Sequence, residues 1–481
     1  MSWCAENLRD VQAWRDENLS LSASSNEAAK LFDGVIRQCV SWTDCEQLGG
    51  IEASTEKMLN LEPDFVMGKA LALGLSAWEC SRSVNVDSAL HKELEDLVVE
   101  SKNRNCTMRE KRHALAVNYL GHGHLQKACI EWNEILKDHP NDLMAVKFLH
   151  DGYFHLGQSD AMRNFMEKVI VKWDPKTPCY SYLHGMYAFG LEESGHIDQG
   201  IEEAKIALNL HRQDCWGNHA MVHCLEMKSM FDEGIKFLDS TVDDWKECSA
   251  LASHQHWHNA LFHVEKGDTE TALSIFDKEM TKGRRGLGTM VDAAALFTRL
   301  ELEGVTIGQE RWRELLFYAK SHLHDHSMLF YDAHISMVLS HLNEEDTLEK
   351  HLKSIANIAW FVQTNVVPLI IRDFSNGEGD NAKLTGEIGI PICEAIVDFN
   401  LGRNEDAFEK LYPIRGKFYQ IGSSHVQQDV LTQILIHSGL RSTNTAHKIL
   451  TLQVIEEREV TKPNSPVTTR LIAQHRERQS G

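Results

Sequence analysis

The sequence is poor in residues that break helices and in positive charge. Only 9 of the 481 residues are proline and 30 are glycine, which argues against a β-rich or disordered chain. Lysine and arginine number 49 against 70 acidic residues, giving a formal net charge of −21. This charge excludes general nucleic-acid binding and docking on anionic membranes, because both need a cationic surface.

The sequence also lacks paired cysteines, a leader segment and a long apolar run. Its eleven cysteines form no Cys-x-x-Cys pair, so the ligand spacing of a zinc finger is missing. The start, MSWCAENLRDVQAWRDENL, is charged and has no apolar core of a signal peptide. No stretch approaches the roughly 18 apolar residues of a membrane span. Dispersed free cysteines fit a reducing compartment, so we expect a cytoplasmic protein without a membrane span.

What the sequence does contain is a repeat. Between residues 107 and 140, small residues, a turn glycine and a terminal proline occupy the positions typical of a 34-residue tetratricopeptide unit. These residues are Ala116, Gly123, Ala128, Trp132 and Pro140. Small residues let two antiparallel helices approach closely, and glycine permits the turn between them. The segment therefore predicts a pair of antiparallel helices.

The same spacing recurs along the chain. The clearest units cover 107–140, 179–212 and 252–285, and degenerate units lie near 141–175, 215–248, 329–355 and 388–414. Recurrence of this kind predicts an all-α fold, a tetratricopeptide-like α-solenoid that forms a right-handed superhelix of antiparallel helix pairs. Because no long linker interrupts the units, we expect 1–481 to be a single α-solenoid. We expect the polar segment 375–389 to be an exposed loop and the tail from residue 461 to fray.

Two histidine pairs with helical spacing lie in the middle of the repeats. His219, His223 and Glu226 fall on one face of a helix, and His254 and His258 repeat the pairing about one unit later. The repeat spacing places both pairs on the first helix of a repeat unit, and the first helices of successive units line the concave side of a solenoid. We therefore expect all five side chains to point into one cavity.

Segments outside the repeat spacing indicate a family. NLSLSASSNEAAKLFDGVI, KFLHDGYFHLG, LFYDAHISM and NSPVTTRLI resemble segments of the tetratricopeptide repeat protein 38 family in the same order, and the resemblance covers essentially the whole chain. The wider family, which has bacterial members, implies recurring polar motifs. They fall here on His219, His223 and Glu226, on His254 and His258, on Asp332 and His334, and on His425 and Asp429. Gln428 stands where the family usually has an arginine, so the resemblance carries no anion-binding role there.

These motifs predict a ligand pocket, together with His150 and Asp151 on the first helix of a preceding repeat unit. Its candidate residues are His150, Asp151, His219, His223, Glu226, His254, His258, Asp332, His334, His425 and Asp429. Imidazole pairs with a carboxylate suit zinc, iron or copper, so His219, His223 and His258 are candidate ligands of a divalent transition metal. Alanine at position 220 excludes the HExxH signature. The local run HLHDH at 322–326 is interpreted as a solvated helix start.

Three functions stay open at this point. The concave groove could bind a protein partner, the usual role of such repeats, or bind a small molecule in the histidine-rich pocket. Alternatively, the same pocket could belong to a metal- or cofactor-assisted enzyme acting on a small molecule. Interior histidines bonded to carbonyl groups would explain the same residues without any ligand. The sequence does not determine the oligomeric state.

Overall fold

The structure is a computed structural model that describes residues 3–282, 286–364 and 380–480. Within these ranges the chain is helical and contains no strand. None of the described helices is both long enough and apolar enough to cross a bilayer. The scarcity of proline and glycine thus has its expected consequence, an all-α fold.

The helices follow one another with short connections. The first half of the chain forms α1 (Val11–Asp16), α2 (Asn26–Ser41), α3 (Gly50–Leu61), α4 (Val66–Trp78), α5 (Ser88–Asn103), α6 (Met108–Gly121), α7 (Leu125–Asp138), α8 (Leu143–His155), α9 (Ser159–Ile170), α10 (Tyr180–Glu193), α11 (Ile197–Leu210), α12 (Cys215–Met227) and α13 (Phe231–Trp245).

The second half continues the series. It forms α14 (Ser249–Glu265), α15 (Thr269–Ile275), α16 (Leu287–Leu302), α17 (Gln309–Ser321), α18 (Leu329–His341), α19 (Glu345–Thr364), α20 (Asp380–Leu384), α21 (Ile390–Asn400), α22 (Asn404–Leu411), α23 (His425–Arg441), α24 (Thr445–Thr461) and α25 (Pro466–Ser480). Short turns of other helix types lie at η1 (Trp3–Ala5), η2 (Glu46–Leu48), η3 (Phe276–Met280), η4 (Thr385–Gly389) and η5 (Tyr412–Ile421).

The pair α6 and α7 shows why these residues form helical hairpins. Thr107 caps α6, and its hydroxyl and the Glu110 carboxylate form a reciprocal capping box. Gly123 has φ +74° in the turn, a conformation that glycine adopts without strain. Ala116 and Ala128 are fully buried, as small residues at a close helix contact must be. The fold is thus a tetratricopeptide-like α-solenoid of antiparallel helix pairs.

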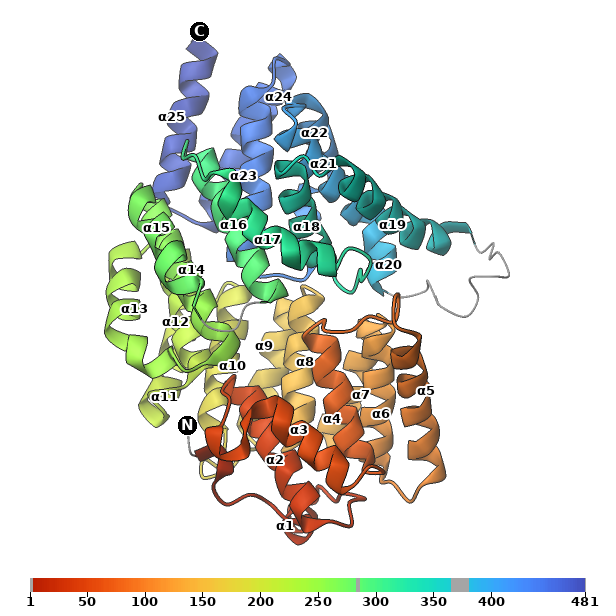
Figure 1. Cartoon of the computed structure of the whole chain (residues 1–481). Coiled ribbons are helices and arrows are strands. Elements are labelled where there is room, and N and C mark those ends of the chain that lie inside the picture. The colour runs from red at the N-terminus through yellow and green to blue at the C-terminus, as the bar shows by residue number, and fades with distance from the viewer. Residues whose placement is uncertain (1–2, 283–285, 365–379, 481) are drawn as a thin grey trace.

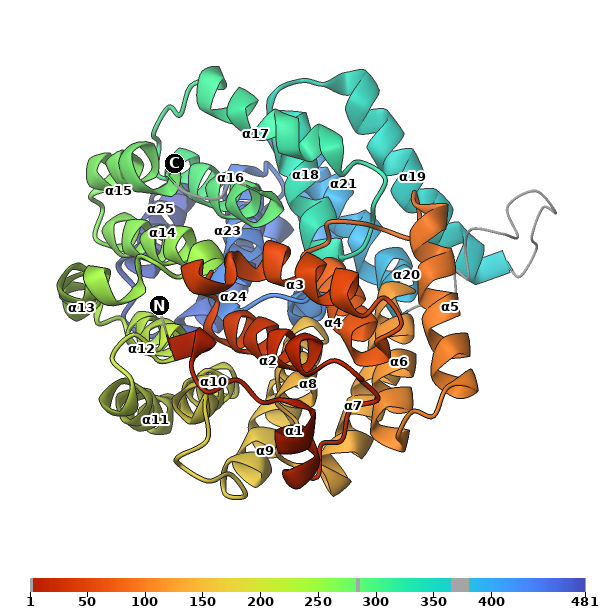
Figure 2. The same cartoon turned by 60° about the horizontal axis from the view of Figure 1, so that its bottom comes forward.

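The solenoid closes into a ring. In Figure 2 the helices from α5 to α19 follow one another around the molecule, and α2 and α3 cross its centre. Figure 1 shows the N-terminal helices below and the C-terminal helices above. The two halves bond directly: the Ser83 hydroxyl donates to the Asp325 carbonyl at 2.6 Å, and the Gln126 amide donates to the Asp380 carboxylate at 2.8 Å. Segments more than 200 positions apart therefore share an interface.

The chain's own ends cover the inner face of the repeats. The Trp216 indole donates to the Val40 carbonyl at 3.0 Å, so the end of α2 rests on the start of α12. On the other side, α23 packs against α12 and α16, and α25 packs against α14. Buried apolar side chains line these contacts throughout. The first helices in the middle of the chain are consequently enclosed on both sides.

Two predicted flexible segments are helical. The expectation of a loop at 375–389 is wrong for 380–389, where α20 and η4 bury Ala382, Thr385 and Ile388 at helical spacing, while 375–379 lie outside the described residues. The expected fraying of the tail is also wrong. Arg470 of α25 donates to the carbonyls of Val264 and Glu265, at 2.9 Å each, which anchors the helix.

Candidate metal centre

Helices α12 and α14 position the two histidine pairs. The Asp214 carboxylate caps α12 by accepting from the Gly217 amide at 2.9 Å. Every residue of α12 is buried because neighbouring repeats and α23 surround it. A helix that is buried on all sides has no solvated face, so its histidines must find partners inside the protein.

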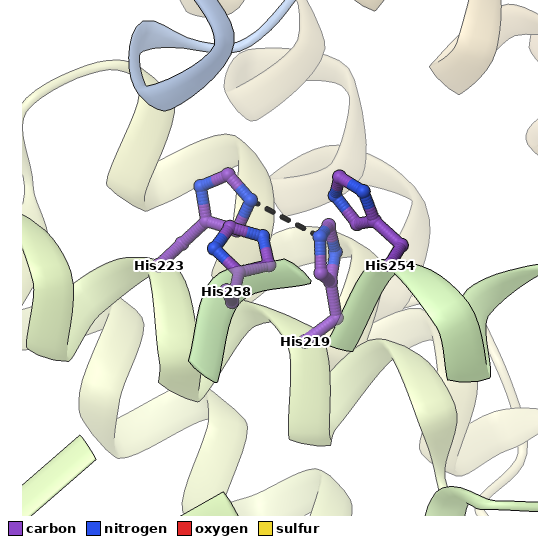
Figure 3. A group of neighbouring side chains, drawn as sticks. All are labelled: His219, His223, His254 and His258. Carbon is purple, nitrogen blue, oxygen red and sulfur yellow. Dashed lines mark hydrogen bonds between the residues drawn. The ribbon is translucent and has the colours of Figure 1, made fainter. Parts of the chain in front are cut away.

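The four imidazoles meet in one cluster (Figure 3). One ring nitrogen from each of His219, His223, His254 and His258 lies within 4.8 Å of the others. The Nε2 atoms of His219 and His223 are 3.0 Å apart, and the ring centroids of His223 and His258 are 4.6 Å apart. Nitrogens that share an ion bound at about 2.0 Å lie roughly 3–4 Å from one another. Small side-chain rotations would thus bring all four onto one ion.

Carboxylates hold the outer nitrogens of two of these rings. The Asp292 carboxylate accepts from Nδ1 of His254 at 2.8 Å, and the Glu226 carboxylate accepts from Nδ1 of His258 at 3.1 Å. Both bonds leave Nε2 free of its proton and directed away from the carboxylate. Metal-binding histidines are commonly oriented in this way.

Three ring nitrogens of these histidines lack a hydrogen-bond partner among the described residues. They are Nδ1 of His219, Nδ1 of His223 and Nε2 of His258, and all three are buried. Each such buried polar atom costs about 1–3 kcal/mol. Burial lowers the pKa of His223 to about 3 and lowers the pKa values of His219 and His258 well below the ordinary value. The rings are therefore neutral, which is the form that binds metals.

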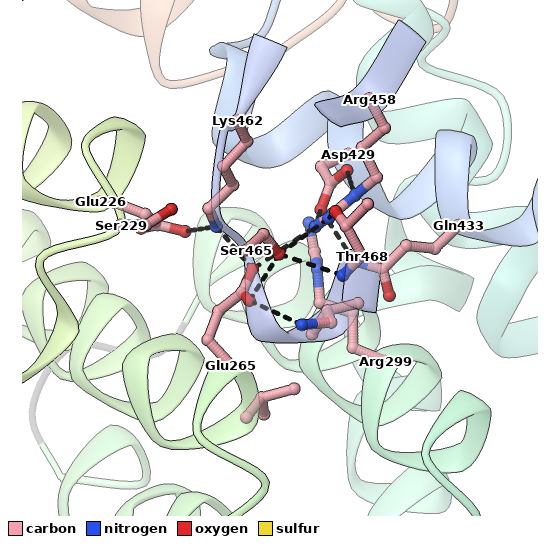
Figure 4. Close-up of polar contacts among 12 residues, drawn as sticks. Glu226, Ser229, Glu265, Arg299, Asp429, Gln433, Arg458, Lys462, Ser465 and Thr468 are labelled. Atoms are coloured by element: carbon pink, nitrogen blue, oxygen red, sulfur yellow. Dashed lines mark hydrogen bonds and ion pairs between the residues drawn. The ribbon is translucent and has the colours of Figure 1, made fainter. Parts of the chain in front are cut away.

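A buried ionic network extends from the cluster to the C-terminal helices (Figure 4). Glu226 accepts from the Lys462 ammonium at 3.0 Å, and Lys462 also pairs with Glu265 at 2.7 Å. Glu265 in turn pairs with Arg458, whose guanidinium binds Asp429 at 2.8 Å. The predicted pocket residue Glu226 thus joins His258 to the end of α24.

A pair of carboxyl groups lies on the far side of His223. Nδ1 of His223 is 3.5 Å from the nearer oxygen of Glu192 and 3.8 Å from that of Glu193. Nδ1 of His425 is 3.7 Å from Glu193. Burial raises the pKa of Glu192 and of Glu193 to about 8. At neutral pH this pair therefore holds protons unless a cation compensates its charge.

The other predicted pocket residues make separate contacts. His150 bonds the Met186 carbonyl at 3.1 Å, and Asp151 pairs with Lys147. Asp332 bonds Nδ1 of His326 at 2.8 Å. Two further candidates also have partners of their own: His334 bonds the Phe330 carbonyl and Asp429 bonds Arg458.

The sequence analysis missed several polar residues near these groups. Asp292, Glu192 and Glu193 come from neighbouring repeats and carry no motif of their own. His326 was interpreted as part of a solvated helix start, which is wrong. The residue is 5% exposed and its ring bonds the Ser354 hydroxyl at 2.9 Å, because α19 covers it. Regular i,i+4 spacing is the signal that identified the four histidines, and these residues lack it.

Comparison with known proteins supports no specific family. No protein-family model matches the chain. A Rap protein in complex with Competence and Sporulation Factor is similar at 11% identity and a TM-score of 0.41, over 69% of this chain and 98% of that one. A monomeric mutant of IFIT1 with Gppp-AAAA is similar at 13% identity and a TM-score of 0.37, over 98% of each chain. Both TM-scores lie below 0.5, so no ligand or activity of these proteins is transferred to this chain.

Proposed function

We propose that this chain is a metal-binding helical-repeat protein of the tetratricopeptide repeat protein 38 family. The metal is a divalent transition ion held by His219, His223, His254 and His258. The observation that carries the proposal is the convergence of four ring nitrogens within 4.8 Å. Nε2 of His258, unpartnered among the described residues, and the carboxylates that accept from Nδ1 of His254 and His258 support the same conclusion.

The donor set favours binding over catalysis at this ion. Imidazole suits zinc, copper, iron and nickel. Four protein ligands complete a tetrahedral zinc shell, whereas catalytic zinc sites keep one position open for water or substrate. We therefore rank a stabilising metal centre above the alternative, a metal-assisted enzyme acting on a small molecule.

Elemental analysis tests the proposal. Protein purified without chelators or a polyhistidine tag is expected to contain at least one transition-metal ion per chain. His258→Ala and His219→Ala should each lower the content several-fold, because each removes one of four ligands. The matched control is His150→Ala, which removes a buried histidine of a neighbouring first helix and should leave the content unchanged. Wild-type protein that stays metal-free after incubation with zinc and copper salts would refute the proposal.

A second role, binding of a small molecule, is favoured by a separate cavity. Its volume is about 500 Å³, and it lies between α4–α6 and residues of 324–329, 354–358 and 380–384. That volume falls within the range of ligand pockets, about 300–1,000 Å³, and its walls include Leu73, Leu94 and Leu120. Binding of a protein partner, the third role, would use outer surfaces, because the four histidines lie too deep for such contact. We propose a cytoplasmic location and no nucleic-acid partner, in keeping with the charge of −21.

A further inference from the structure

His223 has donor groups on both sides of its ring. Its Nε2 faces His219 at 3.0 Å inside the four-histidine cluster. Its Nδ1 faces Glu192 and Glu193 at 3.5 and 3.8 Å. One imidazole thus separates two groups of potential metal ligands.

The distances in the second group are those of ligands that share an ion. Ligands of one tetrahedral ion lie roughly 3.3 Å apart, whereas a contact of about 3.6 Å is too long for a hydrogen bond. The contacts from Nδ1 of His223 to Glu192 and from Nδ1 of His425 to Glu193 measure 3.5 and 3.7 Å. Nδ1 of His223 and one oxygen each of Glu192 and Glu193 thus lie close enough to share an ion, and His425 approaches the other oxygen of Glu193.

Glu192 supplies an independent sign of a missing cation. It is 1% exposed, and neither of its carboxylate oxygens has a hydrogen-bond partner among the described residues. A buried carboxyl group in such a place stays ionised only beside a proton donor or a cation, and otherwise keeps its proton. Glu192, Glu193 and His223 also bring one ligand atom each within 4.8 Å. A divalent cation between them would satisfy all these atoms.

We propose that a second divalent transition ion binds Glu192, Glu193 and His425, and that His223 bridges it to the ion of the four-histidine cluster. This inference rests on the proposed function for the first ion. Ligation through both ring nitrogens releases the remaining His223 N–H proton to solvent and leaves a bridging imidazolate. Glu192 and Glu193 also release to solvent the protons that they hold without an ion, and bind as carboxylates. With metal–nitrogen bonds of about 2.0 Å on each side, the ions lie roughly 6 Å apart. Two carboxylates and the imidazolate offset most of the charge of the two ions.

A cavity lies beside His425, next to this second position. It measures about 250 Å³ and is lined by His425, Asp429 and Lys462. The side chain of His425 is 34% exposed, whereas Glu193 is 6% exposed. His425 therefore lies between the cavity and the buried carboxylates, where it can ligate an arriving ion.

Copper loading tests the bridge. Protein loaded with Cu²⁺ is expected to bind about two ions per chain, with an electron paramagnetic resonance signal weakened by coupling through the imidazolate. The double variant Glu192→Gln/Glu193→Gln should bind one ion and give a full mononuclear nitrogen-ligated signal. His258→Ala should also lose the coupling. The control is Glu203→Gln, which alters a carboxylate paired with His184 elsewhere in the repeats and should keep both ions.

The outcomes separate this inference from the proposed function. One ion in wild type, lost in His219→Ala but retained in the double variant, overturns the second site and leaves the first intact. Two uncoupled ions overturn the bridge. An ion that depends on Glu192 but not on His219 overturns the proposed function and with it the shared His223. A metal-free protein refutes both.

Discussion

Single residues in the cluster differ in how firmly they are oriented. Asp292 and Glu226 fix the rings of His254 and His258 through Nδ1, which selects the tautomer that presents Nε2. Nδ1 of His219 has no such partner among the described residues. Nδ1 of His223 is likewise unpartnered in the described part of the chain, so His219 and His223 are the ligands whose orientation depends most on the ion itself.

The cap of α12 provides a pH-dependent test at this scale. Burial raises the pKa of Asp214 to about 7, above the value of about 3.9 in an unfolded chain. Between these two pKa values the folded protein holds a proton that the unfolded chain has lost. The stability that this proton contributes is therefore lost as the pH rises from the unfolded to the folded pKa of Asp214. Asp214→Asn keeps a capping oxygen and should remove this dependence. The free energy of unfolding of the variant, measured by urea denaturation and expressed relative to that of wild type, should rise by about 1–3 kcal/mol from pH 5 to pH 8.

Asp142 is the matched control, since it caps α8 in the same way. Burial alone would raise its pKa, but His113 and Arg109 hold it well below the ordinary range. The stability contributed by the ionised Asp142 carboxylate is therefore fully present at any pH above its pKa in the unfolded chain, which includes pH 5 and pH 8. Asp142→Asn should destabilise the protein to a similar extent at pH 5 and pH 8. A parallel response of the two variants would contradict the assignment for Asp214.

At the scale of helix pairs, close packing between α14 and its partners is the property to test. Ala260 is fully buried at a position where the repeat spacing demands a small residue. Ala260→Leu should lower the free energy of unfolding by about 1–3 kcal/mol through overpacking, measured by urea denaturation. Ala446→Leu, on an exposed position of α24, should change it by less than about 0.5 kcal/mol. Equal effects would show that Ala260 lies outside the helix contact.

Helix pairing was predictable from the sequence because it depends on local spacing. Gly123 and Ala128 determine a turn and a close contact within one hairpin, and i,i+4 spacing places His219 beside His223. The position of Glu192 beside His223 was not predictable in this way. It depends on how successive repeats stack, and single residues there carry no periodic signal. The covering of α12 by α23 involves segments about two hundred residues apart, which no local pattern encodes.

At the scale of the whole molecule, Lys462 fastens the C-terminal helices to the middle of the chain. Its ammonium pairs with Glu226 and Glu265, all three residues being buried. Lys462→Met should destabilise the protein by about 3–5 kcal/mol, because Glu226 is left buried without its cation and Glu265 keeps only Arg458. Hydrogen exchange should rise in α24 and α25 before it rises in α6 and α7.

The exposed pair of Lys228 with Asp198 serves as the comparison. Its side chains are 37% and 86% exposed, and pairs of this kind contribute at most about 1 kcal/mol. Lys228→Met should leave unfolding and hydrogen exchange nearly unchanged. If Lys462→Met also left unfolding and hydrogen exchange unchanged, the ionic network would not be what holds the C-terminal helices against the middle of the chain.

The closed ring has a consequence for synthesis on the ribosome. An open solenoid can acquire structure repeat by repeat as it emerges, since each unit contacts only its neighbours. Here α12 is complete some two hundred residues before α23 exists, an interval of roughly 10–40 s at about 5–20 residues per second. During this interval one face of the nascent helix and its imidazoles stay accessible. That delay is the period in which an ion can reach the buried donors without crossing the finished protein.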